Sequence, residues 1–337
     1  MRRKKKKVKI RTKKKSPKPT LTAPPTLFSP TKIKVVGIGG GGTSIVAEIS
    51  KSLTRASFVA ADTDWRSLKK NSGIHRLPFG QNVTYGLGTG MNWELAKTAA
   101  ENEKEKIAKV FKGQDISILV ASLGGGVGSG ASPVFAQMAQ QSKCLTLGIF
   151  TLPFKFEGAQ KTALAKRAFE SAKAYLNASV AIPNERIFKV IDEKTPINTA
   201  LSTVNKSLIQ SLQSLIEIIY NPGLINIDFA DIRTILKERN KLAFLNTAQA
   251  SGKNAAEEIN KKIFHNPLYN YNLKPEKILF NIAADSNLSM LDVEKISRIV
   301  ADSNPRAKII FGISRSPKSK NKIKATLFAT GESLFAQ

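Results

Sequence analysis

The stretch Ser122-Leu-Gly-Gly-Gly-Val-Gly-Ser-Gly130 lies between an apolar run over 116–121 and a helical pattern over 131–139. The apolar run is typical of a buried strand, and the five glycines that follow it let the backbone approach a ligand where side chains would block it. Backbone N–H groups at the start of the next helix, together with the helix dipole, favour an anion such as phosphate. A flexible linker rarely has a strand and a helix so close on either side, so we interpret the stretch as a phosphate-binding loop.

The 337-residue chain is long enough for two domains, and 42% of its residues are hydrophobic. No apolar run reaches the ~18 residues that a membrane-spanning helix needs. The single cysteine, Cys144, cannot form an internal disulfide and is expected in a buried strand. No Cys and His residues have the spacing of a metal site, and no nucleophile is paired with a base. We therefore expect a soluble protein of a reducing compartment, with no metal site of its own.

The net charge of +28 is unevenly distributed, because residues 1–31 hold twelve Lys or Arg and no acid. Like charges at this density repel one another, which predicts a disordered tail. The tail lacks the apolar central region of ~7–15 residues that marks a secretory signal. Residues 2–18 are expected either to bind an anionic membrane or nucleic acid, or to form a solvated tail without a partner.

The first predicted strand ends in the glycine cluster Gly39–Gly42, which a helix follows. Gly37, Gly39 and Gly42 fit the pattern GxGxxG, and Asp62 comes directly after the second predicted strand. A dinucleotide-binding fold has this arrangement, with the acid holding the ribose. An NAD-dependent dehydrogenase of the Rossmann type is therefore one candidate.

A further glycine cluster, Tyr85-Gly-Leu-Gly-Thr-Gly-Met91, precedes a helical pattern over 94–111. Three Gly-rich turns can surround a polyphosphate from several sides, which is more than one dinucleotide turn requires. The alternation of strands and helices predicts a parallel sheet that binds its ligand beyond the carboxyl ends of its strands.

Downstream of the glycine clusters, Glu157 lies in a loop before a helix predicted over 159–176. It can accept hydrogen bonds from ribose hydroxyls, although acids near helix starts also interact favourably with the helix dipole. A long amphipathic helix is then predicted from Ile197 to Tyr220. A helix of ~24 residues spans ~36 Å, enough to run the depth of one domain and connect it to another.

Beyond that helix, Asn226, Asp228 and Asp231 lie in an otherwise apolar stretch. Asp228 is a good N-cap for a helix over 229–237, and Asp231 is expected near the same helix end. Two carboxylates there repel one another, so a cation or a polarised water between them would explain the pair better. If the long helix keeps them from the glycine loops of their own chain, a catalytic role has to be played in a neighbouring subunit. The remainder, about 240–331, predicts an α+β domain.

These motifs, in this order and spacing, resemble the FtsZ family of bacterial tubulin-like cell-division GTPases. Gly124–Gly130 is similar to the family signature GGGTGTG, Gly39–Gly42 to its first glycine loop, and Thr84–Gly90 to its third phosphate loop. Residues 151–158 resemble the ribose loop, and residues 221–231 are nearly identical to the synergy loop.

The resemblance covers nearly everything from residue 32 to 331 and implies an α/β fold. A GTP-binding domain with a parallel sheet is expected over 32–195, a central connecting helix over 196–221, and a smaller α+β C-terminal domain over 222–331. The basic tail 1–31 and a short tail 332–337 flank them.

The resemblance also implies a site shared between subunits. GTP or GDP is expected on the glycine loops, with Mg²⁺ bound through the nucleotide. Asn226, Asp228 and Asp231 of the next subunit in a filament are expected to complete the site and polarise the attacking water. The residues implied to contact the nucleotide are Gly39, Gly40, Gly41, Gly42, Gly88, Thr89, Gly90, Gly124, Gly125, Gly126, Val127, Gly128, Ser129, Gly130, Glu157, Lys161, Leu201 and Asn205.

The departures from the family pattern cluster on the nucleotide side. Val127 replaces a signature threonine, and Lys161 stands where an arginine commonly contacts phosphate. Leu201 stands where an aromatic ring often stacks on guanine, and Asn205 where an aspartate usually reads the base. Lysine keeps the charge without the bidentate fork, and one neutral hydrogen bond is worth about 0.5–1.5 kcal/mol. We therefore expect lower GTP affinity or altered turnover, and not an inactive site.

The leading interpretation is a cytoplasmic GTPase that forms head-to-tail filaments at the division site. One alternative is a weakly hydrolysing or non-hydrolysing polymer whose basic tail binds membrane or nucleic acid. A more remote one is the dehydrogenase, which gives no role to Asn226, Asp228 and Asp231. Because the chain ends soon after Gly331, the adaptor-binding terminal peptide of the family is expected to be absent, and residues 2–18 are expected to act as a substitute anchor.

Overall fold

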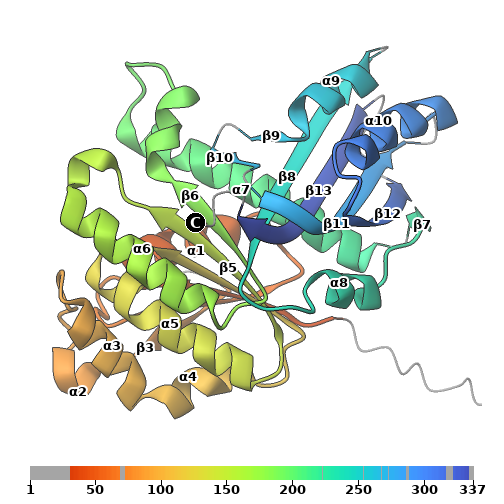
Figure 1. Cartoon of the computed structure of the whole chain (residues 1–337). Coiled ribbons are helices and arrows are strands. Elements are labelled where there is room, and N and C mark those ends of the chain that lie inside the picture. The colour runs from red at the N-terminus through yellow and green to blue at the C-terminus, as the bar shows by residue number, and fades with distance from the viewer. Residues whose placement is uncertain are drawn as a thin grey trace, which may run out of the picture. The chain divides into compact units, whose positions relative to one another are not determined.

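The computed structural model (Figure 1) describes residues 31–333, apart from 69–72, 222, 253, 267, 272, 286–287 and 316–321. The predicted attachment segment 2–18 lies outside the described residues.

The amino-terminal half of the described chain is built on a parallel sheet, as the sequence predicts. Its strands are β1 (Ile33–Ile38), β2 (Ser57–Asp62), β3 (Ile74–Pro78), β4 (Ile116–Ser122), β5 (Leu145–Leu152) and β6 (Ala178–Pro183). They pair in parallel in the order β3-β2-β1-β4-β5-β6. β4 is buried along nearly its whole length, which explains why its sequence ISILVAS is mostly apolar and shows no polar face.

Helices cover both faces of this sheet (Figure 1). The helical elements of this half are α1 (Gly39–Ile49), α2 (Gln81–Thr84), α3 (Trp93–Asn102), α4 (Lys104–Phe111), α5 (Gly126–Gln141), η1 (Lys155–Glu157), α6 (Ala159–Lys173) and η2 (Asn184–Lys189). Helices α3 to α6 share one core cluster, in which Phe135 makes edge-to-face contacts with Phe79 and Phe111. Helix α1 packs into the other cluster, on the opposite face.

The single helix expected over 94–111 is in fact two helices, α3 and α4, which meet at Glu103. The backbone of Glu103 leaves the helical region, with φ −116° and ψ 26°. Its carboxylate accepts a hydrogen bond of 2.6 Å from the backbone N–H of Gly80. The break therefore coincides with a hydrogen bond to a residue 23 positions away, and the local helical pattern does not predict this bond.

The long helix α7 (Ile197–Tyr220) has the predicted bounds and runs for 24 residues. Its apolar stripe packs on α1 and on two strands of the carboxy-terminal half. In the part of the chain that the structure describes, no helix combines the length and apolar character needed to cross a membrane.

The carboxy-terminal half is α+β, as predicted. Its elements are β7 (Gly223–Ile225), α8 (Phe229–Ile235), β8 (Lys241–Ser251), α9 (Ala255–Lys262), β9 (His265–Asn266), β10 (Tyr269–Asn270), β11 (Leu273–Ala284), α10 (Met290–Asp302), β12 (Lys308–Arg315) and β13 (Lys322–Ser333). β13 lies antiparallel between β8 and β11, and β12 pairs in parallel with β11.

The two halves share one hydrogen-bonded sheet, because β8 pairs in parallel with β6 at Ala178 and Ser179. Asn177, which is buried just before β6, fixes this junction. Its Oδ1 accepts from the N–H of Thr146 at 2.8 Å, and its Nδ2 donates to the carbonyl of Leu236 at 2.7 Å. The halves predicted as separate domains are therefore joined by backbone pairing as well as by α7.

Candidate functional site

The three predicted glycine turns come together at the carboxyl ends of β1 and β4. At Gly39, where φ is +73°, a Cβ atom would lie 3.0 Å from the backbone nitrogen of Gly128. At Gly126, a Cβ atom would lie 2.5 Å from both the carbonyl oxygen of Gly90 and Thr89 Oγ1. The first and third turns therefore both touch the start of α5, and side chains at these positions would push them away.

The starts of α1 and α5 form the floor of this site. Their N-cap residues, Ile38 and Gly125, make no side-chain capping hydrogen bond, and neither first turn holds an acidic residue. The first backbone N–H groups of a helix have no partner within it, and the helix dipole adds partial positive charge there. Cβ atoms at Gly40 and Gly125 would meet nothing within 4 Å among the described residues. Two adjacent helix ends thus offer free donors to an anion.

Thr89 lies where the third glycine turn meets the start of α5. Its hydroxyl is buried and has no hydrogen-bond partner in the described part of the chain. Ser129, by contrast, is 2% exposed, and its Oγ accepts a hydrogen bond of 2.8 Å from the backbone N–H of Gly124. Val127 is half-buried against the apolar core. The Ser129 hydroxyl therefore holds the loop itself, and Val127 contributes packing.

Glu157 and Lys161 face each other across one turn, and their side chains form an ion pair of 2.9 Å. The second carboxylate oxygen of Glu157 accepts from the backbone N–H of Phe154 at 2.9 Å. Burial raises the pKa of Glu157, but the hydrogen bonds from Lys161 and Phe154 outweigh it and hold that pKa below its usual value. Both predicted ligand contacts are thus partly engaged with each other.

Two clefts lie on either side of η1. One, of about 800 Å³, is lined by Met91, Trp93, Glu157 and Lys161 together with Arg167, whose guanidinium lies 4.3 Å from the Trp93 ring centroid. It opens beside the third glycine turn, and its lining carries two cations of α6, Lys161 and Arg167.

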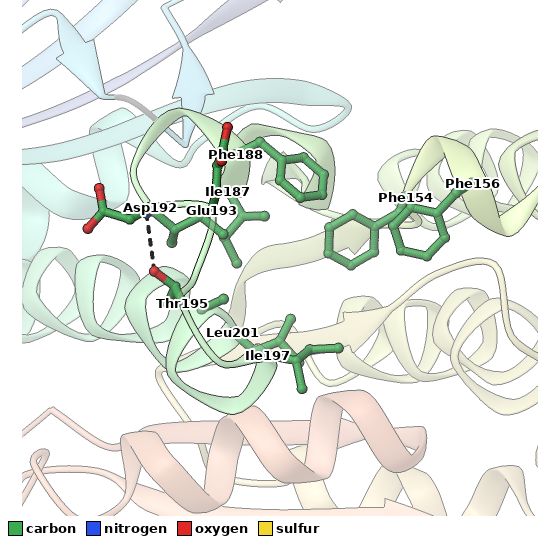
Figure 2. Close-up of a pocket in the computed structure, with 11 residues that line it drawn as sticks. Phe154, Phe156, Ile187, Phe188, Asp192, Glu193, Thr195, Ile197 and Leu201 are labelled. Atoms are coloured by element: carbon green, nitrogen blue, oxygen red, sulfur yellow. Dashed lines mark hydrogen bonds between the residues drawn. The ribbon is translucent and has the colours of Figure 1, made fainter.

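The other cleft, of about 560 Å³, is mainly apolar and is drawn in Figure 2. Phe154 stacks on Phe156 with ring centroids 4.8 Å apart and lies 5.8 Å from Phe188. Leu201, at the start of α7, lies on the opposite wall and is 39% exposed. Sequence reasoning missed this aromatic cluster, whose residues come from η1, its N-cap Phe154 and η2, which are far apart in the sequence.

Asn205 lies one helical turn after Leu201, and its amide is held by Glu48 of α1 at 2.7 Å. Glu48 is a second residue that sequence reasoning missed. Its position on α1, one turn after Ser44 at the end of the first glycine turn, is the sequence signal that could have indicated it.

Asn226, Asp228 and Asp231 are grouped with each other and not with the glycine turns. Asp228 caps α8, as predicted: its Oδ1 accepts from the N–H of Asp231, whose Oδ2 accepts from the N–H of Asp228, both at 3.0 Å. This reciprocal capping box accounts for the close carboxylates without the cation or water expected between them. Asn226 Oδ1 accepts from the N–H of Gly223 at 3.1 Å.

The end of α7 fixes the position of this group relative to the sheet. The Tyr220 hydroxyl donates to the carbonyl of Thr31, just before β1, and Arg55, just before β2, donates to Asn221 Oδ1 at 2.8 Å. The stretch that begins at Asn221 is thus anchored at the amino ends of the parallel strands, whereas the glycine turns lie at their carboxyl ends. Within one chain, the two predicted parts of the site are at opposite edges of the sheet.

No three His, Cys, Asp or Glu side chains within the described ranges form a group that could hold a metal ion. A cation at this site would therefore need oxygen ligands from a bound anion in addition to any that the protein supplies.

Comparison with known proteins gives two family matches in order along the chain. A model of the Tubulin/FtsZ family, GTPase domain, matches residues 32–192, and a model of the FtsZ family, C-terminal domain, matches residues 242–333.

Similar solved structures include proteins of the same family. An FtsZ dimer from M. jannaschii is similar with a TM-score of 0.79 and 28% identity, over 90% of this chain and 89% of that one. Two Haloferax volcanii proteins share the fold at lower identity. CetZ2, in a GTPγS-bound protofilament, has a TM-score of 0.76 and 19% identity over 90% of this chain and 93% of that one. CetZ1, a GDP-bound monomer, has a TM-score of 0.75 and 18% identity over 89% of this chain and 94% of that one.

Proposed function

Because this chain belongs to the tubulin/FtsZ family of GTPases, we propose that it binds and hydrolyses GTP and assembles head to tail into filaments. The observation that carries the proposal is the separation of the glycine turns from Asp228 and Asp231 to opposite edges of the parallel sheet. In a head-to-tail contact the two edges meet, so each junction between subunits would contain one complete site.

The phosphates of GTP would lie at the starts of α1 and α5, where free backbone donors and the Thr89 hydroxyl converge. The ribose would lie near Glu157, and the guanine near Leu201 and Asn205. Mg²⁺ bound through the phosphates would offset their negative charge. Lys161 would contact a phosphate after exchanging some of its interaction with Glu157, which fits the lower affinity expected from the sequence.

Asn226, Asp228 and Asp231 of the adjoining subunit would hold the attacking water. Each carboxylate uses one oxygen in the capping box, and the second oxygen of each has no hydrogen bond to any described residue. The capping box therefore fixes both groups without occupying them fully. A water held by these oxygens is polarised toward the terminal phosphate, and this arrangement exists only in the assembled state.

Exposed apolar side chains at both edges support such an assembly. Phe156 and Phe188 line the apolar cleft and are 75% and 56% exposed, whereas Leu224 and Ile225, beside Asn226, are 68% and 46% exposed. Two different apolar surfaces at opposite ends of a subunit suit a heterologous contact, which propagates into a filament. The M. jannaschii dimer and the CetZ2 protofilament are consistent with self-association of this kind.

The proposal is tested by sedimentation and phosphate release from purified chain with GTP, with GDP and without nucleotide. We expect sedimentable polymer with GTP and release of phosphate from it. The variant Asp231→Asn should still sediment with GTP but release phosphate more slowly, whereas Asp302→Asn, at the end of α10, should behave as the wild type. Failure to bind GTP at millimolar concentration would overturn the proposal.

A second candidate is a polymer that hydrolyses GTP slowly or not at all. The engagement of Lys161 with Glu157 and the absence of a hydroxyl at Val127 favour it. GTP-dependent sedimentation without phosphate release would identify this candidate.

The cellular role proposed is cell division, with residues 2–18 attaching the filament to an anionic membrane. Each basic residue close to such a surface contributes about 1 kcal/mol. Deletion of residues 2–18 should abolish co-sedimentation with anionic liposomes while leaving GTP-dependent assembly intact. Unchanged co-sedimentation would rule out this attachment, and a preference for nucleic acid over liposomes would assign the tail to the other partner.

A further inference from the structure

Glu48 of α1 makes two short hydrogen bonds to α7 beside the position proposed for the guanine base. Its Oε1 accepts from the Ser202 hydroxyl at 2.7 Å, and its Oε2 accepts from Asn205 Nδ2, also at 2.7 Å. Glu48, Ser202 and Asn205 are all half-buried. The contact joins residues 157 positions apart and ties the helix of the first glycine turn to the helix that carries Leu201.

This contact fixes which way the Asn205 amide faces. An ionised carboxylate only accepts hydrogen bonds, so the NH₂ group of Asn205 has to face Glu48. The amide oxygen Oδ1 then faces away from Glu48, and it has no hydrogen-bond partner among the described residues. Without Glu48 the amide could rotate and present either its oxygen or its NH₂ group.

Whether Asn205 presents its amide oxygen or its NH₂ group decides which purine base it can pair with. Guanine presents N–H donors at N1 and N2, whereas adenine presents an acceptor at N1. An amide oxygen matches the guanine donors, as an aspartate would, and repels the adenine N1. An amide free to rotate would accommodate both bases.

Building on the proposed function, we propose that Glu48 is a positioning residue that sets guanine selectivity by locking Asn205 as a hydrogen-bond acceptor. Asn205, oriented by Glu48, then presents a hydrogen-bond acceptor to the base, as a carboxylate at this position would. A site built to pair a polar group of the ligand discriminates strongly against analogues that leave it unpaired, so the lock affects selectivity more than affinity.

The test measures dissociation constants for GTP and ATP, by competition against a fluorescent guanine nucleotide, at protein concentrations too low for assembly. In Glu48→Gln the carboxylate becomes an amide that can itself rotate, so the lock is lost. We expect the GTP-over-ATP preference to fall at least about tenfold. Ser202→Ala removes the other hydrogen bond to Glu48 and should leave the preference within about twofold of the wild type.

The double variant provides the sharper result. Asn205→Asp alone places two carboxylates against each other and should weaken GTP binding. Adding Glu48→Gln to Asn205→Asp restores a donor facing the new carboxylate and should recover both GTP binding and selectivity. The same substitution, Glu48→Gln, is thus harmful in the wild-type background and beneficial in the Asn205→Asp background. A merely structural contact would reverse sign in thermal stability alone and would leave the GTP-over-ATP preference of every folded variant unchanged.

Thermal unfolding of each variant shows whether it is folded, and rescue of Asn205→Asp by the second substitution reports on the pair even if the single variant unfolds. A wild type that prefers GTP, with an unchanged preference in Glu48→Gln, would overturn this inference alone. A wild type that binds neither nucleotide would overturn the proposed function and the inference with it.

Discussion

The contact between the third glycine turn and the start of α5 allows a quantitative test of the phosphate site. In Gly126→Ala, the new methyl group would lie 2.5 Å from the Gly90 carbonyl oxygen and from Thr89 Oγ1. The turn would have to move by about 1 Å to restore a normal contact. We expect this overpacking to lower the free energy of unfolding by about 1–3 kcal/mol.

The same movement should withdraw at least one donor from the phosphates. A hydrogen bond to a charged group is worth about 1.5–3 kcal/mol, which corresponds to a loss of roughly 10- to 150-fold in GTP affinity. Isothermal titration at low protein concentration measures this loss directly.

Gly148→Ala is the matched control, because a Cβ atom there would also lie 2.5 Å from its neighbours, Leu176 and Phe150, but in the middle of β5. It should lower stability by a similar amount and leave GTP affinity unchanged. If folded Gly126→Ala bound GTP as tightly as folded Gly148→Ala, the assignment of these loops to the phosphates would be refuted.

Three further results are expected. Asp228→Ala should remove the cap of α8 and lower stability by about 1 kcal/mol. It should also greatly slow phosphate release without changing GTP affinity. The control Ser289→Ala, which removes the cap of α10, should lower stability by a similar amount and release phosphate at the normal rate. Because the folded-state pKa of Glu157 is depressed, its stabilisation is present above the unfolded-state pKa of about 4.3 and is lost as the pH falls through the folded-state pKa. Urea unfolding should therefore find Glu157→Gln less stable than the wild type near neutral pH and equal to it in acid, and equal stability at both would contradict the ion pair's contribution. Asn177→Ala should lower the free energy of unfolding by about 1–3 kcal/mol, because it leaves buried backbone groups of β5 and of the end of α8 unpaired. A loss below about 1 kcal/mol in chemical denaturation would count against the role of Asn177 at the junction.

The parts of the fold that the sequence predicts well are those that local pattern determines. The sequence predicts the bounds of helix α7 because its apolar residues keep helical spacing up to Tyr220, after which the sequence continues with a proline and a glycine. β1 and β4, which precede the first glycine turn and the stretch 122–130, follow from short, mostly apolar runs that end in glycines.

Contacts between distant residues account for what the sequence did not predict. The break at Glu103 accompanies its hydrogen bond to Gly80, and the two halves of the single large sheet are joined through the pairing of β6 with β8. β3, with the sequence IHRLP, has too little apolar character to be recognised and forms because β2 supplies its pairing partner. Local periodicity carries no information on such pairings.

The candidate site also combines features that local sequence predicts with features that depend on distant contacts. The glycine turns and the stretch around Asp228 are recognisable from motif and spacing. The use of the Ser129 hydroxyl inside its own loop and the bond from Asn205 to Glu48 depend on three-dimensional packing. The departures at Leu201 and Asn205 could be read from the sequence, but the acid that orients Asn205 could not.

The most direct test of a site shared between subunits is the rate of phosphate release per subunit, measured over a range of protein concentrations that spans the onset of light scattering. We expect very low turnover below that onset and a steep rise above it, because Asp228 and Asp231 reach the nucleotide only across a subunit junction. A rate per subunit that stayed constant through the whole range would contradict the shared site.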